Sequence, residues 1–97
     1  MSAYFIAISK ITDRDKLNQY LAGAPASLAG RKVEVVVYTE SAEAVEGTPP
    51  GGRLVVMKFD SKDDAMDWYN SPEYQGVVQL RQAGTEGFAV VAEGFGA

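Results

Sequence analysis

Two short segments of the chain are apolar on both of the faces that a β-strand presents. Residues 33–39 and 53–60 are dense in β-branched residues and too short for typical helices, so both are predicted strands. We expect them to pair as a hairpin centred near Glu46. The pairs expected on one face are Val33–Phe59, Val35–Met57 and Val37–Val55, and those on the other are Glu34–Lys58, Val36–Val56 and Tyr38–Leu54.

An antiparallel sheet with one face in water alternates between apolar and polar residues along each strand. Neither predicted strand alternates in this way, because valine, leucine and tyrosine occupy both faces. The helices of one small domain cover one face of such a sheet, and a chain of 97 residues has no further element for the second face. We therefore expect a homodimer whose two sheets pack face to face.

The first third of the chain predicts a strand followed by a helix. Residues 3–11 are rich in β-branched and aromatic residues. Thr12 and Asp15 resemble a capping box, and apolar residues then recur at helical spacing. Pro25 lacks an amide hydrogen, so a kink or restart of the helix is expected there before Gly30 closes the unit. Residues 40–52 are a predicted loop with room for a short extra strand at 44–46.

The last third predicts two consecutive helices and a final strand. Ser61 is the expected N-cap of the first helix, and Ser71 with Pro72 starts the second, which ends near Gly84. Residues 88–93 are the last predicted strand. The order strand, helix, strand, strand, helix, strand is the ferredoxin-like βαββαβ pattern. We expect one α+β domain over residues 1–97, with an antiparallel four-stranded sheet.

Composition excludes several classes of site. The chain has no cysteine and no histidine, which removes disulfides, thiolate nucleophiles, the commonest metal ligand and the usual general base, so no metal and no cofactor is expected. A net charge of −4 is the wrong sign for binding nucleic acid. No apolar run reaches the length of a bilayer span, and the N-terminus lacks the basic region of a signal peptide, so we expect a cytoplasmic protein without a membrane partner.

Aromatic and arginine side chains are the candidate binding residues. Trp68, Tyr69 and Tyr74 flank the break between the two predicted helices, where they either pack the helices together or line a small-molecule cavity. Arg53 and Arg81 are permanent cations suited to a carboxylate or phosphate. The alternative for these arginines, and for Arg31, is ion pairing with Glu46, Glu73 or Glu93, and Lys58 is expected to pair with Glu34 across the hairpin.

These segments resemble a small bacterial family, domain of unknown function thirteen-thirty, within the dimeric α/β-barrel superfamily. The residues that carry the resemblance are Asp13, Tyr20, Glu46-Gly47, residues 53–59, Ala65, residues 68–75, Arg81, Val91 and Glu93-Gly94. The resemblance implies a ferredoxin-like fold and a homodimer whose sheets form a barrel, without implying a reaction. The superfamily includes cofactor-free monooxygenases, muconolactone isomerases and heme-dependent enzymes, and a histidine ligand to heme is impossible in this chain.

Two hypotheses of function follow. The first is a site between the helices and the sheet of each protomer that binds a small aromatic or anionic metabolite. Its candidate residues are Tyr38, Arg53, Trp68, Tyr74 and Arg81. The second is a non-enzymatic dimer that acts through structural or protein interactions. A cofactor-independent monooxygenase or isomerase remains an alternative to both.

Overall fold

The computed structural model describes residues 1–96, which form four strands, three α-helices and one 3-10 helix. In chain order these elements are β1 (Ala3–Ile11), α1 (Arg14–Gly23), the 3-10 helix η1 (Ala24–Leu28), β2 (Val33–Thr39), β3 (Arg53–Phe59), α2 (Lys62–Tyr69), α3 (Pro72–Gly84) and β4 (Thr85–Glu93). Within residues 1–96 no helix combines the length and the apolar character needed to cross a membrane.

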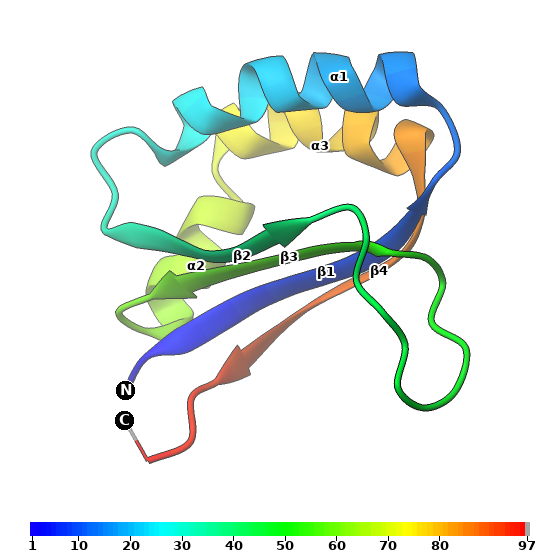
Figure 1. Cartoon of the computed structure of the whole chain (residues 1–97). Helices are drawn as coiled ribbons and strands as arrows, with labels where there is room; N and C mark the ends of the chain where they lie inside the picture. Colours follow the sequence, from blue (N-terminus) through cyan, green and yellow to red (C-terminus); the bar gives the residue numbers. More distant parts are fainter. Residues whose placement is uncertain (97) are drawn as a thin grey trace.

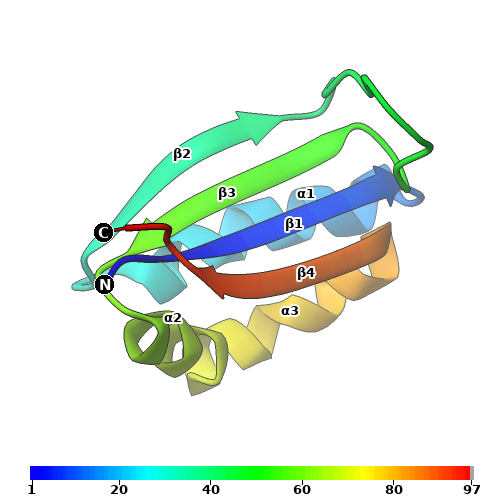
Figure 2. The same cartoon turned by 90° about the horizontal axis from the view of Figure 1, so that it is seen from below.

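The strands form a single antiparallel sheet in the order β2-β3-β1-β4. The helices pack on one side of this sheet (Figure 1), and Figure 2 shows the other side with the strands in front and the helices behind them. We call these two sides the helix face and the open face. The topology confirms the predicted α+β, ferredoxin-like fold.

Short polar side chains start the helices. Ser61 accepts a hydrogen bond from the backbone N–H of Asp64, and Ser71 accepts one from Tyr74, so both predicted caps are confirmed. The capping box predicted on Thr12 is wrong, because Asp13 is the N-cap of α1 and accepts from the N–H of Lys16 at 3.1 Å.

Proline and glycine set where the helices end. The helix restarts at Pro25 as predicted, because α1 gives way to η1 at Ala24. The predicted end of the last helix near Gly84 is also confirmed, because α3 ends at this residue. A Cβ atom on Gly84 would lie 2.8 Å from the backbone nitrogen of Leu17, so the absence of a side chain lets α3 end against α1. The Gly84 carbonyl then accepts the N–H of Thr12 at 2.9 Å.

The β2–β3 register agrees with prediction at one end only. The pairs Val33–Phe59, Glu34–Lys58 and Val35–Met57 are confirmed. A bulge between Val35 and Val37 then shifts the register, so Val37 pairs with Val56, and Tyr38 pairs with Val55. The expected pairs Val37–Val55, Val36–Val56 and Tyr38–Leu54 are therefore wrong. The shift places Tyr38 on the helix face, in register with a buried residue.

Two further boundaries differ from the prediction. Residues 40–52 contain no strand, so the extra strand expected at 44–46 is wrong. The final strand begins at Thr85 instead of Phe88, because its first three residues continue the pairing with β1. Glycine and glutamate at these positions have low strand propensity, and pairing with a central strand overrides it.

The helix face holds the hydrophobic core. Alternate residues of β1 and β3 point into it, and the aromatic rings of Phe5, Phe59, Trp68 and Tyr74 fill its centre. The open face is also apolar. Residues in register form two rows across all four strands, namely Val37–Val56–Ile6–Val90 and Thr39–Leu54–Ile8–Phe88. On β4, Phe88 is 56% exposed and Val90 is 45% exposed.

The loop of residues 40–52 extends beyond the sheet on the side away from the helices (Figure 1). Its base is held close to β1, since a Cβ atom on Gly51 would lie 2.4 Å from the Cα atom of Lys10. Together with Ile8 and Leu54 of the open face, the loop lines an open surface pocket of about 410 Å³. The 40–52 loop therefore borders the open face beside Ile8 and Leu54.

Candidate functional site

The five predicted site residues all belong to the helix face, and the structure divides them into an aromatic part and a polar part. Trp68 lies on α2, Tyr74 and Arg81 lie on α3, and Arg53 and Tyr38 lie on β3 and β2. Trp68, Tyr74, Arg53 and Arg81 are each at least nine-tenths buried, whereas Tyr38 is 48% exposed.

Trp68 belongs to the aromatic core. Its ring centroid lies 5.1 Å from that of Phe5, 5.5 Å from that of Phe59 and 4.1 Å from that of Tyr74. The indole N–H donates to the hydroxyl of Ser27 at 3.0 Å, so its single polar group is already satisfied. Trp68 therefore packs η1 and α2 against the sheet, and this packing is one of the two roles considered for it.

A hydrogen-bonded group joins α1 to α3 beside this core. The hydroxyl oxygens of Tyr20 and Tyr74 lie 2.9 Å apart, and the Nε–H of Arg81 donates to the Tyr74 hydroxyl at 3.3 Å. Burial, and then the neighbouring Tyr74, raises the pKa of Tyr20 far above its ordinary value of 10.0. Tyr20 therefore stays a neutral hydrogen-bond partner, and the Tyr20–Tyr74 bond uses one of the two hydroxyl hydrogens of the pair.

Arg53 lies at the start of β3 with its side chain buried against the helix layer. Its Nε and Nη1 atoms have no hydrogen-bond partner within the described residues, although Arg53 is only 3% exposed. Ser9 is directly opposite in the β1–β3 register, is equally buried, and its Oγ atom is also unpartnered. The guanidinium carbon of Arg53 is 5.9 Å from the ring centroid of Tyr38, within reach of a cation–π contact.

The ion pairs expected for the arginines do not form. The ion pair in the described part of the chain joins Arg14 to Glu40 at 2.7 Å, on the surface. Arg14 lowers the pKa of Glu40, chiefly through its hydrogen bond, and the charge of Arg53 lowers it slightly further. Among residues 1–96 neither Arg53 nor Arg81 is bonded to a carboxylate, although both are buried. Lys58 faces Glu34 in register, but no ion pair forms between them.

Surface pockets lie elsewhere. Besides the pocket at the 40–52 loop, three pockets of about 270, 320 and 340 Å³ lie beside Gly30, beside Tyr69 and beside Glu34. None of the four is lined by any of the five predicted site residues. Among residues 1–96 no three acidic side chains gather closely enough to hold a metal ion. These four pockets therefore lie outside the arginine site.

Two residues of this site, Ser9 and Tyr20, are missing from the sequence prediction. Ser9 continues the series of buried positions formed by Ala3, Phe5 and Ala7, so a polar residue at an inward position of β1 was an available signal. Tyr20 fits the apolar stripe of α1, and its hydroxyl contact lies 54 residues away in the sequence. Nothing local distinguishes it from a core tyrosine.

The phenol pair predicts a graded loss of stability. Tyr74→Phe leaves both the Tyr20 hydroxyl and the Arg81 Nε–H buried without a partner, so we expect a loss of about 2–3 kcal/mol. Tyr20→Phe leaves Tyr74 bonded to Arg81, and we expect a loss of about 1 kcal/mol. Urea denaturation at fixed protein concentration measures both values. Equal losses, or a larger loss for Tyr20→Phe, would contradict the hydrogen-bond order described here.

The amino-acid sequence matches the model of one known protein family. The model of the family described as Domain of unknown function (DUF1330) matches residues 2–95. No curated protein matches the chain.

Several solved structures share the fold. A protein of unknown function from Rhodopseudomonas palustris superimposes with a TM-score of 0.78 at 13% identity, over 99% of this chain and 84% of that one. A dimeric ferredoxin-like protein of unknown function from Jannaschia sp. CCS1 gives 0.73 at 11% identity, over 97% and 100% of the two chains. SnoaB, a cofactor-independent oxygenase from Streptomyces nogalater, gives 0.68 at 10% identity, over 99% and 95%. These likenesses establish the fold.

Proposed function

We propose that this chain, which belongs to the family of unknown function DUF1330, is a homodimer that binds a small organic molecule in each protomer, between the helices and the sheet. The observation that carries the binding site is Arg53, a buried cation with two unpartnered nitrogens. An isolated buried charge is costly unless something compensates it. A ligand that binds between the helices and the sheet would supply the missing partner.

The homodimer is supported by the open face. Its two apolar rows cross all four strands, and residues on β4 within these rows are about half exposed. Two sheets that pack face to face bury such rows in a layer about 10 Å thick. The structural relative from Jannaschia sp. CCS1 is described as dimeric. A second copy of the chain is thus the natural cover for this surface.

A ligand screen on the dimer tests the binding site. A panel of neutral and anionic aromatic molecules is added to the full chain, and melting temperature reports binding by mass action, with about 2.7 kcal/mol of stabilisation at one hundred times the Kd. We expect at least one compound to stabilise the protein and to shift the amide NMR signals of Ser9, Tyr20 and Arg53. The proposal fails if no compound binds, or if the shifted signals cluster at the 40–52 loop.

A cofactor-independent enzyme is the second candidate. The fold is shared with SnoaB, which is described as a cofactor-independent oxygenase. In this chain the Tyr20–Tyr74 pair beside Arg81 offers neutral and cationic donors that would stabilise negative charge on a substrate oxygen. Because burial keeps Tyr20 protonated, this group serves as a donor and not as a base. Oxygen consumption with the compound found in the screen separates an oxygenase from a binding protein.

A further inference from the structure

The polar atoms around Arg53 define the chemistry of the group that would bind there. This inference rests on the proposed function, because it names the ligand class of the same site. The unpartnered atoms are the Nε and Nη1 donors of Arg53 and the Oγ of Ser9, which lie opposite one another on the two central strands. An arginine has no acceptor, so its partner must be an acceptor.

The charges around Arg53 also favour a negatively charged ligand. Arg81 donates to the Tyr74 hydroxyl, which is bonded to Tyr20, and the charges of Arg81 and Arg53 both oppose the rise in the pKa of Tyr20. The charge of Arg53 lowers the pKa of Glu40, but both carboxylate oxygens of Glu40 are bonded to Arg14, at 2.7 and 3.0 Å. Among residues 1–96 the buried positive charge therefore has no bonded acidic partner, and a negatively charged ligand would supply one.

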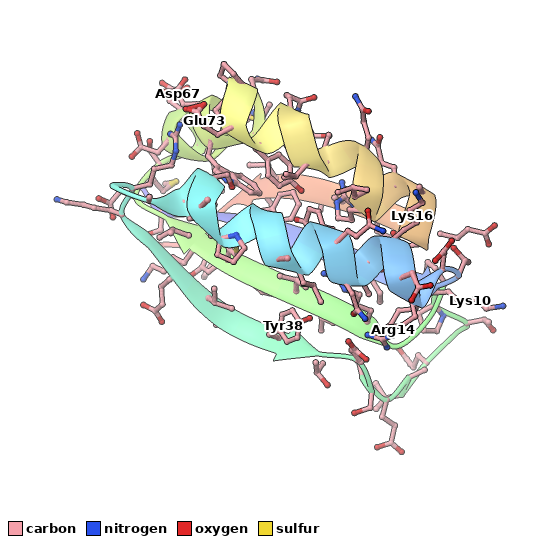
Figure 3. All side chains as sticks on the ribbon, turned by 90° about the horizontal axis from the view of Figure 1, so that it is seen from above. Lys10, Arg14, Lys16, Tyr38, Asp67 and Glu73 are labelled. Atoms are coloured by element: carbon pink, nitrogen blue, oxygen red, sulfur yellow. The ribbon has the colours of Figure 1, made fainter. Side chains whose placement is uncertain are left out.

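The surroundings of Arg53 indicate what else the ligand carries. On the helix face of β2, Tyr38 is 48% exposed and is in register with Val55, two residues along β3 from Arg53, so the helices leave this part of the sheet uncovered. Figure 3 shows Tyr38 beside α1 on the β2 side, with Arg14 further along α1. The Tyr38 ring also lies near the guanidinium of Arg53. Next to the buried charge there is thus an exposed apolar surface.

We propose that the ligand is a small organic acid whose carboxylate binds to Arg53 and Ser9, while its apolar body lies against Tyr38. The free hydroxyl hydrogen of the Tyr20–Tyr74 pair provides a neutral donor nearby. Charge-assisted hydrogen bonds from arginine to a carboxylate are about twice as strong as neutral ones, so the acid group dominates recognition. A singly charged planar group is favoured over phosphate, because a second charge adds a desolvation cost in this buried, apolar region.

Calorimetry with three probes tests this assignment on the protein of residues 1–97. Benzoate carries the carboxylate, benzamide has the same shape without the charge, and inorganic phosphate is the competing anion. We expect benzoate to bind at least tenfold more tightly than benzamide and more tightly than phosphate. In NMR spectra, the Nε–H signal of Arg53 should move on addition of benzoate.

Matched variants assign the effect to the site. Arg53→Met is expected to reduce benzoate affinity at least tenfold, and Arg53→Lys and Ser9→Ala severalfold each. Arg31→Met removes the same charge from a residue that lines a different pocket, and benzoate affinity should stay unchanged. The Lys and Ala variants keep the test valid if Arg53→Met does not fold.

Each contrary result has a defined meaning. Equal binding of benzoate and benzamide, or tighter binding of phosphate, overturns the carboxylate assignment and leaves the proposed site intact. An equal loss in Arg31→Met and Arg53→Met shows general charge attraction and also overturns the assignment. If benzoate does not bind while a neutral compound of the wider screen does, only the assignment fails. If no compound of either set binds, the proposed function fails with it.

Discussion

Val56→Glu is expected to convert the protein from a dimer into a monomer. Val56 occupies the middle of the open face, where it is in register with Ile6 on one side and Val37 on the other. In a face-to-face dimer this substitution places two carboxylates in an apolar layer without partners. Each costs several kcal/mol to desolvate, and every 1.4 kcal/mol is a factor of ten in Kd, so we expect dissociation to become at least a thousandfold easier.

Analytical ultracentrifugation at micromolar concentration measures this change. The original protein should sediment at twice the 10.4 kDa mass of the chain, and Val56→Glu at the mass of one chain. Gln79→Glu adds the same charge on the exposed surface of α3 and should remain dimeric. A folded monomer of the unaltered chain, or a Val56→Glu variant that stays dimeric, would rule out the face-to-face assembly.

Trp68→Ala is expected to cause the largest loss of stability. The side chain is almost fully buried among four aromatic rings, and its removal deletes those contacts and leaves a large cavity. Such substitutions cost about 3–5 kcal/mol. A domain of this size has a free energy of unfolding of about 5–15 kcal/mol, so the variant should be close to the limit of folding.

Chemical denaturation compares Trp68→Ala with Trp68→Phe at equal protein concentration. The phenylalanine variant keeps an aromatic ring in the core but loses the hydrogen bond to Ser27, so we expect a loss of about 1–2 kcal/mol. Both variants should lose stability in the absence of any ligand. A normal unfolding curve for Trp68→Ala together with lost ligand binding would instead assign Trp68 to the wall of the binding site.

The regular part of the fold could be predicted because local patterns and global topology agree. Ser61, Ser71 and Pro72 mark helix starts by chemistry that acts within three or four residues. The bulge at Val36 could not be predicted in this way. Valine occupies three consecutive positions there, so shifting the register by one residue exchanges one apolar side chain for another.

In the candidate site, too, the residue types could be predicted from the sequence, whereas the contacts between residues distant in the chain could not. The chemistry of Arg53, Tyr74 and Arg81 predicts a role in the site, and the structure places Tyr74 and Arg81 in contact. Arg53 was expected to have an acidic partner as an alternative, yet none is bonded to it. Whether a buried arginine is paired depends on side chains brought together by folding, which the spacing of residues along the chain does not specify.

The bulge in β2 also bears on how the protein avoids uncontrolled assembly. β2 is an outer strand with one unpaired edge, and an outer strand of regular geometry is a template for lateral addition of further chains. The extra residue at Val36 bends the backbone and interrupts the even spacing of its N–H and C=O groups. Growth of a continuous multi-chain ribbon from this side is thereby disfavoured.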